Sequence, residues 1–136
     1  MITPLYPPQA FLLNDLSPEH QGRFLEGVDL FNQGSFWEAH EAWEDVWKEK
    51  EDPQKKLLQG LIQVAAGYHL IVTRPRINGA LRNLEKSLAK FEGMPDRCFG
   101  IAIDQLKATV TAAHKEAKRI GQEGLSEIAE DCIAKI

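Results

Sequence analysis

Residues 35–47 read SFWEAHEAWEDVW, and this stretch shows a clear helical pattern. At about 100° per residue, the rings of Phe36, Trp43 and Trp47 gather on one face of the predicted helix. His40 lies on the same face, within about 60° of those rings, and Glu44 lies about 40° from His40 on its other side. Because polar and charged groups are costly to bury unless they are paired, we expect these two side chains to have a partner or a purpose.

Signals for the ends of helices stand on both sides of this stretch. Ser17-Pro18 predicts the capped start of a helix that ends at Gly34. Ser35 and Glu38 predict a capping box, in which each side chain binds a free backbone amide of the next helix. The sequence therefore predicts that the aromatic helix begins at residue 36 and runs to about Lys50.

Three further helices and a short terminal one follow by the same criteria. Asp52-Pro53 opens a helix that is apolar on nearly all sides, and Pro75 opens another that Gly93 ends. The helical period returns over residues 97–120 and again over residues 125–136. No segment alternates with a period of two. The sequence thus predicts an all-α fold, a compact antiparallel helical bundle of about five main helices plus a short C-terminal helix.

Length and composition suit a single bundle domain. The chain has 136 residues, of which 43% are hydrophobic, so we expect one domain over residues 17–136. Proline-rich residues 1–16 are expected to form an extended N-terminal arm. The two cysteines, Cys98 and Cys132, lack the spacing of a zinc site or a disulfide framework, so we expect buried thiols.

Net charge and hydropathy argue against two classes of partner, nucleic acids and membranes. The formal net charge of −4 argues against a nucleic-acid surface, which needs a basic patch. No apolar run approaches the length of a membrane span, and the N-terminus lacks the pattern of a signal peptide. We therefore expect no nucleic acid, no membrane and a cytoplasmic location.

The short turn at residues 51–53 predicts which residues meet across two helices. Residues equally far from the turn should face each other, which places Gln63 opposite His40. Gln63 is then a candidate hydrogen-bond partner for His40. Gly60 and Gly67 lack side chains, and we expect them to admit the rings of Trp43 and Trp37.

Several motifs together resemble a known family. They are a helix led by Gly27, the aromatic core over Trp37 to Trp47, the QGLIQVAAGYH segment from Gln59 to His69, and the GAL segment from Gly79 to Leu81. This combination is similar to the uncharacterised family named domain of unknown function 309, over about residues 24–92. The resemblance implies a compact all-α fold. It implies no reaction, because the family has no established activity.

The polar and aromatic residues around His40 allow two readings without catalysis. In the first, His40 and Glu44 are hydrogen-bonded core residues. In the second, they form the base of a pocket for a small ligand or a peptide. The candidate residues for this cluster are Trp37, His40, Glu41, Trp43, Glu44, Trp47, Gln59, Gln63, Tyr68 and His69.

A third reading is metal chemistry. His40 and Glu44, with Glu41 between them, form an HExxE pattern that resembles part of a zinc-binding HExxH helix. A hydrolytic metal site needs three protein ligands and an open position for water. His114 is the candidate for a third ligand. The alternative function is therefore a metal-dependent hydrolase that uses His40 and Glu44.

Two surfaces remain as binding candidates. Arg74, Arg76 and Arg82 lie around the predicted start of the fourth helix, where free amides favour an anion. The sequence favours a second reading over this one, in which the arginines form a solvated end that makes salt bridges. Apolar residues in the last segment, from Ile128 to Ile136, suit either packing on the bundle or a homodimer interface.

No common signature of a catalytic nucleophile, a phosphate-binding loop or a cofactor site occurs in the chain. We therefore predict a binding or interaction module without catalysis and without a cofactor. Its partner is an unidentified protein or small-molecule ligand.

Overall fold

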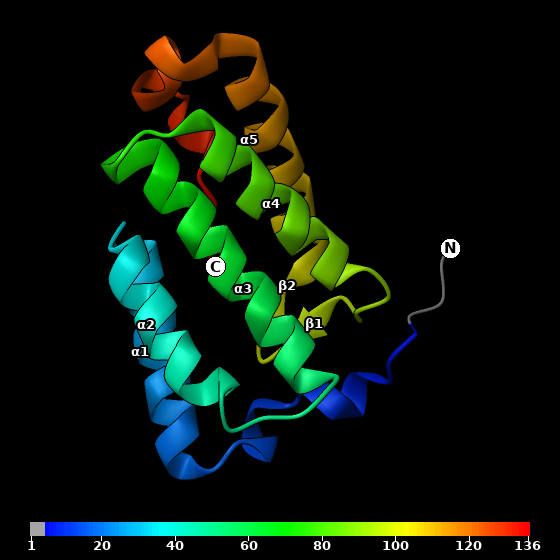
Figure 1. Ribbon diagram of the computed structural model, residues 1–136. Helices are drawn as coiled ribbons and strands as arrows, with labels where there is room; N and C mark the ends of the chain where they lie inside the picture. Colours follow the sequence, from blue (N-terminus) through cyan, green and yellow to red (C-terminus); the bar gives the residue numbers. More distant parts are fainter. Residues whose placement is uncertain (1–4) are drawn as a thin grey trace.

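A computed structural model describes residues 5–136, so residues 1–4 of the predicted arm lie outside the described residues. The predicted all-α bundle is confirmed. Helix α3 runs through the middle of the molecule, α1 and α2 lie on one side of it, and α4 and α5 lie on the other (Figure 1). The helices are α1 (Pro18–Asn32), α2 (Phe36–Trp47), α3 (Gln54–Tyr68), α4 (Ile77–Phe91) and α5 (Ile103–Gly124).

The N-terminal arm contains two short 3₁₀ turns and packs on the bundle. These are η1 (Pro8–Phe11) and η2 (Leu13–Asp15). Phe11 is buried, and its carbonyl oxygen accepts a hydrogen bond of 2.7 Å from the amide of Phe99. The Leu5 amide donates to the carbonyl of Gly93 at 2.8 Å. The arm thus connects to the turn that follows α4.

The two predicted helix caps have different outcomes. The Ser17 oxygen accepts a hydrogen bond of 3.2 Å from the amide of His20, so the cap of α1 is confirmed. Gly34 ends the α1 region with a φ of 85°. The capping box at Ser35 is wrong, because Ser35 has a ψ of 67° and its side chain makes no capping hydrogen bond.

Helices α3 and α4 are joined by a π-helical turn, η3 (His69–Thr73). The start of α4 is held by a side chain from α5. The Oε1 atom of Gln122 accepts a hydrogen bond of 2.7 Å from the amide of Ile77, and its Nε2 atom donates to the carbonyl of Pro75 at 3.0 Å. One glutamine therefore fixes the angle at which the chain enters α4.

The predicted start of the fifth helix at residue 97 is wrong. Residues 97–102 form a small antiparallel hairpin of β1 (Arg97–Cys98) and β2 (Ile101–Ala102). Between them, Phe99 and Gly100 have φ values of 51° and 86°, which a helix does not allow. The apolar residues of this hairpin face the core as helical ones would, so the sequence pattern did not distinguish the two structures.

The predicted terminal helix is also wrong. Two 3₁₀ turns, η4 (Leu125–Glu127) and η5 (Glu130–Cys132), replace it. The chain after η5 is held against the bundle in an extended form. The hydroxyl of Tyr68 donates to the carbonyl of Cys132 and accepts from the amide of Ala134, each at 3.2 Å. These contacts with α3 take the place of bonds within a helix.

Glycines set the spacing of the helices, but not where the sequence predicted it. A side chain at Gly60 would overlap Phe91, and one at Gly67 would overlap Leu84, so both glycines face α4 and not the tryptophans of α2. The buried ring of Trp43 instead packs on Gly27 of α1. Among the residues that the structure describes, no helix combines the length and apolar character needed to cross a membrane.

Candidate functional site

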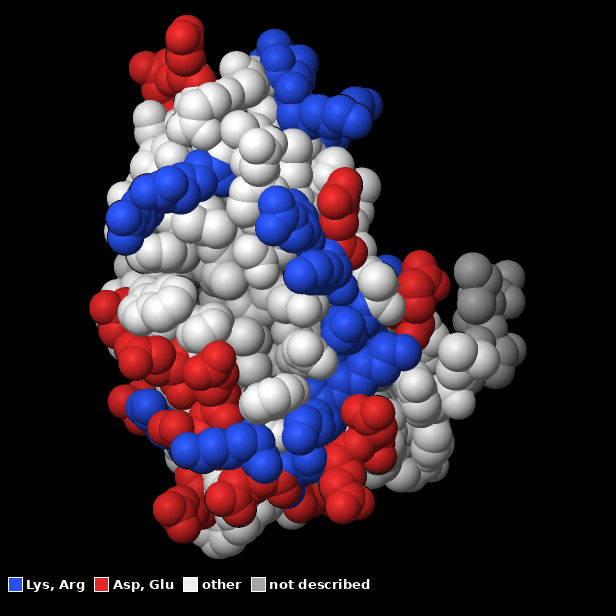
Figure 2. Space-filling view, viewed as in Figure 1, with Lys and Arg blue, Asp and Glu red and all other residues white. Residues whose placement is uncertain are grey.

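Helices α2, α3 and α4 line a small, partly open pocket of about 220 Å³. Its walls are formed by His40, Glu44, Trp47, Gln59, Ile62, Gln63, Ala66 and Asn83. The face of the molecule shown in Figure 2 has acidic side chains gathered over α2, at the left, and a band of basic side chains over α4, towards the right. The pocket is therefore formed by helices whose outer faces carry opposite charge.

Three buried polar atoms belong to residues that line this pocket. They are Nδ1 of His40, Nε1 of Trp47 and Oε1 of Gln63. Within residues 5–136, none of the three has a hydrogen-bond partner. The structure therefore brings His40 and Gln63 together, as the turn geometry predicted, but the expected hydrogen bond between them is absent.

Glu44 stands at the outer edge of the pocket. Its Oε1 atom lies 3.3 Å from Nε2 of His40. The His40 side chain is 15% exposed and the Glu44 side chain 49%. The carboxylate thus faces solvent on one side and Nε2 of the imidazole on the other.

Aromatic rings support His40 from the side. The imidazole stacks on the ring of Trp37, with centroids 4.6 Å apart and planes 11° apart. The ring of His69 lies 5.4 Å from that of Trp37. Trp37 and His69 are therefore neighbours of the pocket but do not line it, and Glu41 is an exposed residue outside the lining.

Two aromatic residues of the predicted cluster have structural partners elsewhere. Trp43 is fully buried, and its Nε1 atom donates to the carbonyl of Phe24 at 3.1 Å. Tyr68 bonds to the C-terminal segment as described above. Burial raises the pKa of Tyr68 to about 12, and the hydrogen bond from Ala134 partly offsets this rise. Neither residue lines the pocket.

Sequence reasoning missed the contribution of α4. Asn83 lines the pocket, and its Nδ2 atom donates to the carbonyl of Gly79 at 2.9 Å. That hydrogen bond fixes the amide and leaves its oxygen free for another contact. Asn83 closely follows the predicted GAL segment, but the turn at residues 51–53 joins only α2 and α3 and therefore does not indicate which residues of α4 face them.

The three candidate metal ligands are not brought together. Nε2 of His114 lies 3.0 Å from Oε1 of Glu85, at the contact between α5 and α4. His114 is not among the residues that line the pocket of His40 and Glu44. Within the described part of the chain, no group of three or more His, Cys, Asp or Glu side chains could hold a metal ion.

The three arginines of the candidate anion site do not all lie together. Arg74 and Arg76 line an open hollow together with Trp37, Glu38, His69 and Leu70. Arg82 is exposed further along α4 and does not line this hollow. The first amide of α4, that of Ile77, is bound by the side chain of Gln122.

Two comparisons with known proteins gave different results. No curated protein matches the chain. The predicted resemblance is confirmed, since the family described as Domain of unknown function (DUF309) matches residues 24–83 of this protein.

Proposed function

We propose that this protein binds a small neutral ligand, with adjacent N–H and C=O groups, in the pocket between α2, α3 and α4. A single observation carries the proposal. Three buried polar atoms, on His40, Trp47 and Gln63, belong to side chains that line one pocket and have no partner in residues 5–136. An unpaired buried polar group costs about 1–3 kcal/mol, so a ligand that pairs all three stabilises the protein.

The donor or acceptor role of each of the three unpaired atoms indicates which groups the ligand carries. The indole N–H of Trp47 can only donate, and the side-chain oxygen of Gln63 can only accept. In the imidazole tautomer with its N–H at Nε2, the atom that faces Glu44, Nδ1 of His40 accepts. The complementary ligand offers one acceptor and one or two N–H donors, which is the edge of a carboxamide.

Size and charge limit the ligand further. A pocket of about 220 Å³ lies below the roughly 300–1,000 Å³ of typical ligand sites, so we expect a compact molecule. Ile62 and Ala66 supply an apolar wall for its carbon atoms. No lysine or arginine is among the lining residues, and the carboxylate of Glu44 repels anions. A neutral amide therefore fits better than a carboxylate of the same shape.

Titration with three matched probes tests the proposal. The ¹⁵N-labelled protein is titrated with benzamide, benzoate and toluene, and the indole N–H resonance of Trp47 is followed after its assignment with Trp47→Phe. We expect a saturable shift with benzamide and none with the other two, since benzoate lacks the N–H donors and toluene lacks both groups.

Gln63→Leu and Gln33→Leu are the matched variants. Gln33 is exposed at the end of α1, so its variant should bind benzamide like the parent protein. Gln63→Leu should abolish the shift while its unfolding free energy stays within about 1 kcal/mol, because replacing an unpaired buried acceptor with a similar apolar group is nearly neutral. Absence of saturation with benzamide, or a shift that persists in Gln63→Leu, would overturn the proposal.

A further inference from the structure

We propose a second site, independent of the first, in which the hollow around Trp37, Arg74 and Arg76 binds a nucleoside monophosphate. The hollow lies beside Trp37 at the junction of α2, η3 and the start of α4. Its volume is about 490 Å³. It shares no lining residue with the pocket of His40 and Gln63.

An exposed tryptophan supplies a stacking surface. Trp37 is 47% exposed, whereas Trp43 on the same helix is fully buried. One face of the Trp37 ring is covered by the parallel ring of His40. His69 lies near it at a tilt of 43°. The ring is thus held in place while much of it faces solvent, as a platform for a planar base requires.

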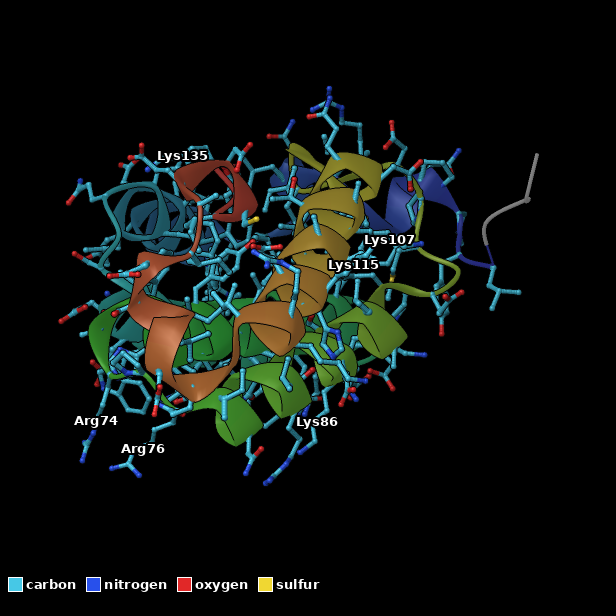
Figure 3. All side chains as sticks on the ribbon, turned by 90° about the horizontal axis from the view of Figure 1, so that it is seen from above. Arg74, Arg76, Lys86, Lys107, Lys115 and Lys135 are labelled. Atoms are coloured by element: carbon cyan, nitrogen blue, oxygen red, sulfur yellow. The ribbon has the colours of Figure 1, made fainter. Side chains whose placement is uncertain are left out.

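Two arginines supply the charge that a phosphate needs. Neither Arg74 nor Arg76 forms an ion pair with a carboxylate within residues 5–136. Figure 3 shows both side chains projecting from the same end of the molecule, away from Lys107 and Lys115. Paired guanidinium groups bind phosphate oxygens with two parallel hydrogen bonds each, so these two fit a phosphate monoester.

One lining residue distinguishes a nucleotide from a simple anion. Glu38 lies in the same hollow as the two arginines, where its charge disfavours an anion at its own position. A carboxylate accepts hydrogen bonds from a ribose diol, as acidic residues do in dinucleotide sites. The hollow therefore offers an aromatic ring, a diol acceptor and a cationic pair, which match the base, sugar and phosphate of one molecule.

The backbone at this place is unusual as well. His69 and the residues up to Thr73 form the π-helical turn η3, and Arg74 follows it directly. Such turns are rare, and they occur frequently at functional sites. Here the turn places His69 beside Trp37 and leads into the segment that carries both arginines.

Calorimetric titration of the full chain with AMP tests the proposal. Adenosine, ribose 5-phosphate and inorganic phosphate serve as probes that lack the phosphate, the base, or both base and sugar. We expect saturable binding of AMP, and binding of each fragment weaker by about tenfold or more, since base stacking alone contributes about 1–3 kcal/mol. Equal binding of AMP and ribose 5-phosphate would reduce the hollow to an anion site and overturn the proposal.

Matched variants assign the binding to this hollow. Arg74→Ala, Arg76→Ala and Trp37→Leu should each weaken AMP binding by about tenfold, whereas Trp37→Tyr keeps a stacking ring and should retain it. Arg82→Ala removes an exposed arginine outside the hollow and should bind AMP like the parent protein. Gln63→Leu should also bind normally, so failure of the first site does not affect this test.

Two further outcomes would overturn the second site. The first applies to variants that circular dichroism has shown to be folded. AMP binding that is unchanged in Arg74→Ala and Arg76→Ala would place the nucleotide elsewhere. Displacement of AMP by hexaglutamate at a lower concentration than AMP itself requires would identify the hollow as a docking surface for an acidic protein segment.

Discussion

Gly27 determines how closely α1 approaches α2. The indole ring of Trp43 lies against this glycine, and its N–H reaches the carbonyl of Phe24 one turn earlier. The rings of Phe24 and Phe31 lie on the same side, with centroids 6.3 and 5.6 Å from that of Trp43. A single position without a side chain thus allows a large ring to be both buried and hydrogen-bonded.

Gly27→Ala should therefore destabilise the protein. The new methyl group would overlap the indole of Trp43, and overpacking of this kind costs roughly 1–3 kcal/mol. Gly22→Ala is the control on the same helix, since that position is exposed with no atom within 4 Å of the added methyl group. There the higher helix propensity of alanine should stabilise by up to about 1 kcal/mol. Urea unfolding of both variants measures the difference, and a stabilised Gly27→Ala would contradict this packing.

The residues of the pocket were partly predictable. Helical angles placed His40, Glu44 and Trp47 on one face, and the short turn placed Gln63 opposite them. The same angles also put Trp43 on that face, yet its ring turns to α1. Angles around one helix do not show which neighbouring helix receives a given ring, and that choice depended on Gly27.

A serine at the start of a helix forms its capping hydrogen bond only where its backbone has the conformation that a cap requires. Ser17 has extended backbone and binds the amide of His20, whereas Ser35 follows Gly34 with a ψ of 67°. The tight turn at Gly34 directs the Ser35 backbone, so a correct cap sequence does not form its hydrogen bond. The hairpin at residues 97–102 is similar, because its left-handed residues leave no signal in the hydrophobic pattern.

Ser17→Ala and Ser35→Ala should therefore differ in effect. Loss of a real cap costs about 1 kcal/mol, and we expect this for Ser17→Ala. Ser35→Ala removes no capping hydrogen bond and should leave the unfolding free energy within about 0.5 kcal/mol. Thermal and urea unfolding of the two variants tests this pair. Equal losses would mean that the capping box of Ser35 forms in solution.

The C-terminal segment closes the bundle by linking α3 to α1. After α5 the chain returns across α3 to Tyr68 and then reaches α1. The amide of Ile136 donates to the side-chain oxygen of Asn32 at 2.8 Å, and Lys135 donates to its backbone carbonyl at 2.6 Å. The helical pattern predicted that this segment packs against the bundle or a second copy. Its non-helical form depends on hydrogen bonds to side chains that are far away in sequence, so the pattern did not indicate it.

Tyr68 makes this closure sensitive to alkaline pH. Its pKa is raised to about 12 in the folded protein, first by burial, against about 10 in an unfolded chain. Between these values the unfolded state releases the proton and the folded state keeps it, so the free energy of unfolding falls as pH rises. The contribution is complete below pH ~10 and is lost by pH ~12, a total of about 2–3 kcal/mol.

Tyr68→Phe isolates this effect from other groups. Burial also raises the pKa of Cys98 to about 12, so the parent protein loses stability from both residues at high pH. The variant lacks the hydroxyl and its two hydrogen bonds, and it should be less stable at pH 8 by about 1–3 kcal/mol. Urea unfolding from pH 8 to 11.5 should show the two stabilities converging as Tyr68 ionises in the unfolded parent protein. A difference that stays constant across this range would mean that the tyrosine hydroxyl is not buried against the C-terminal segment.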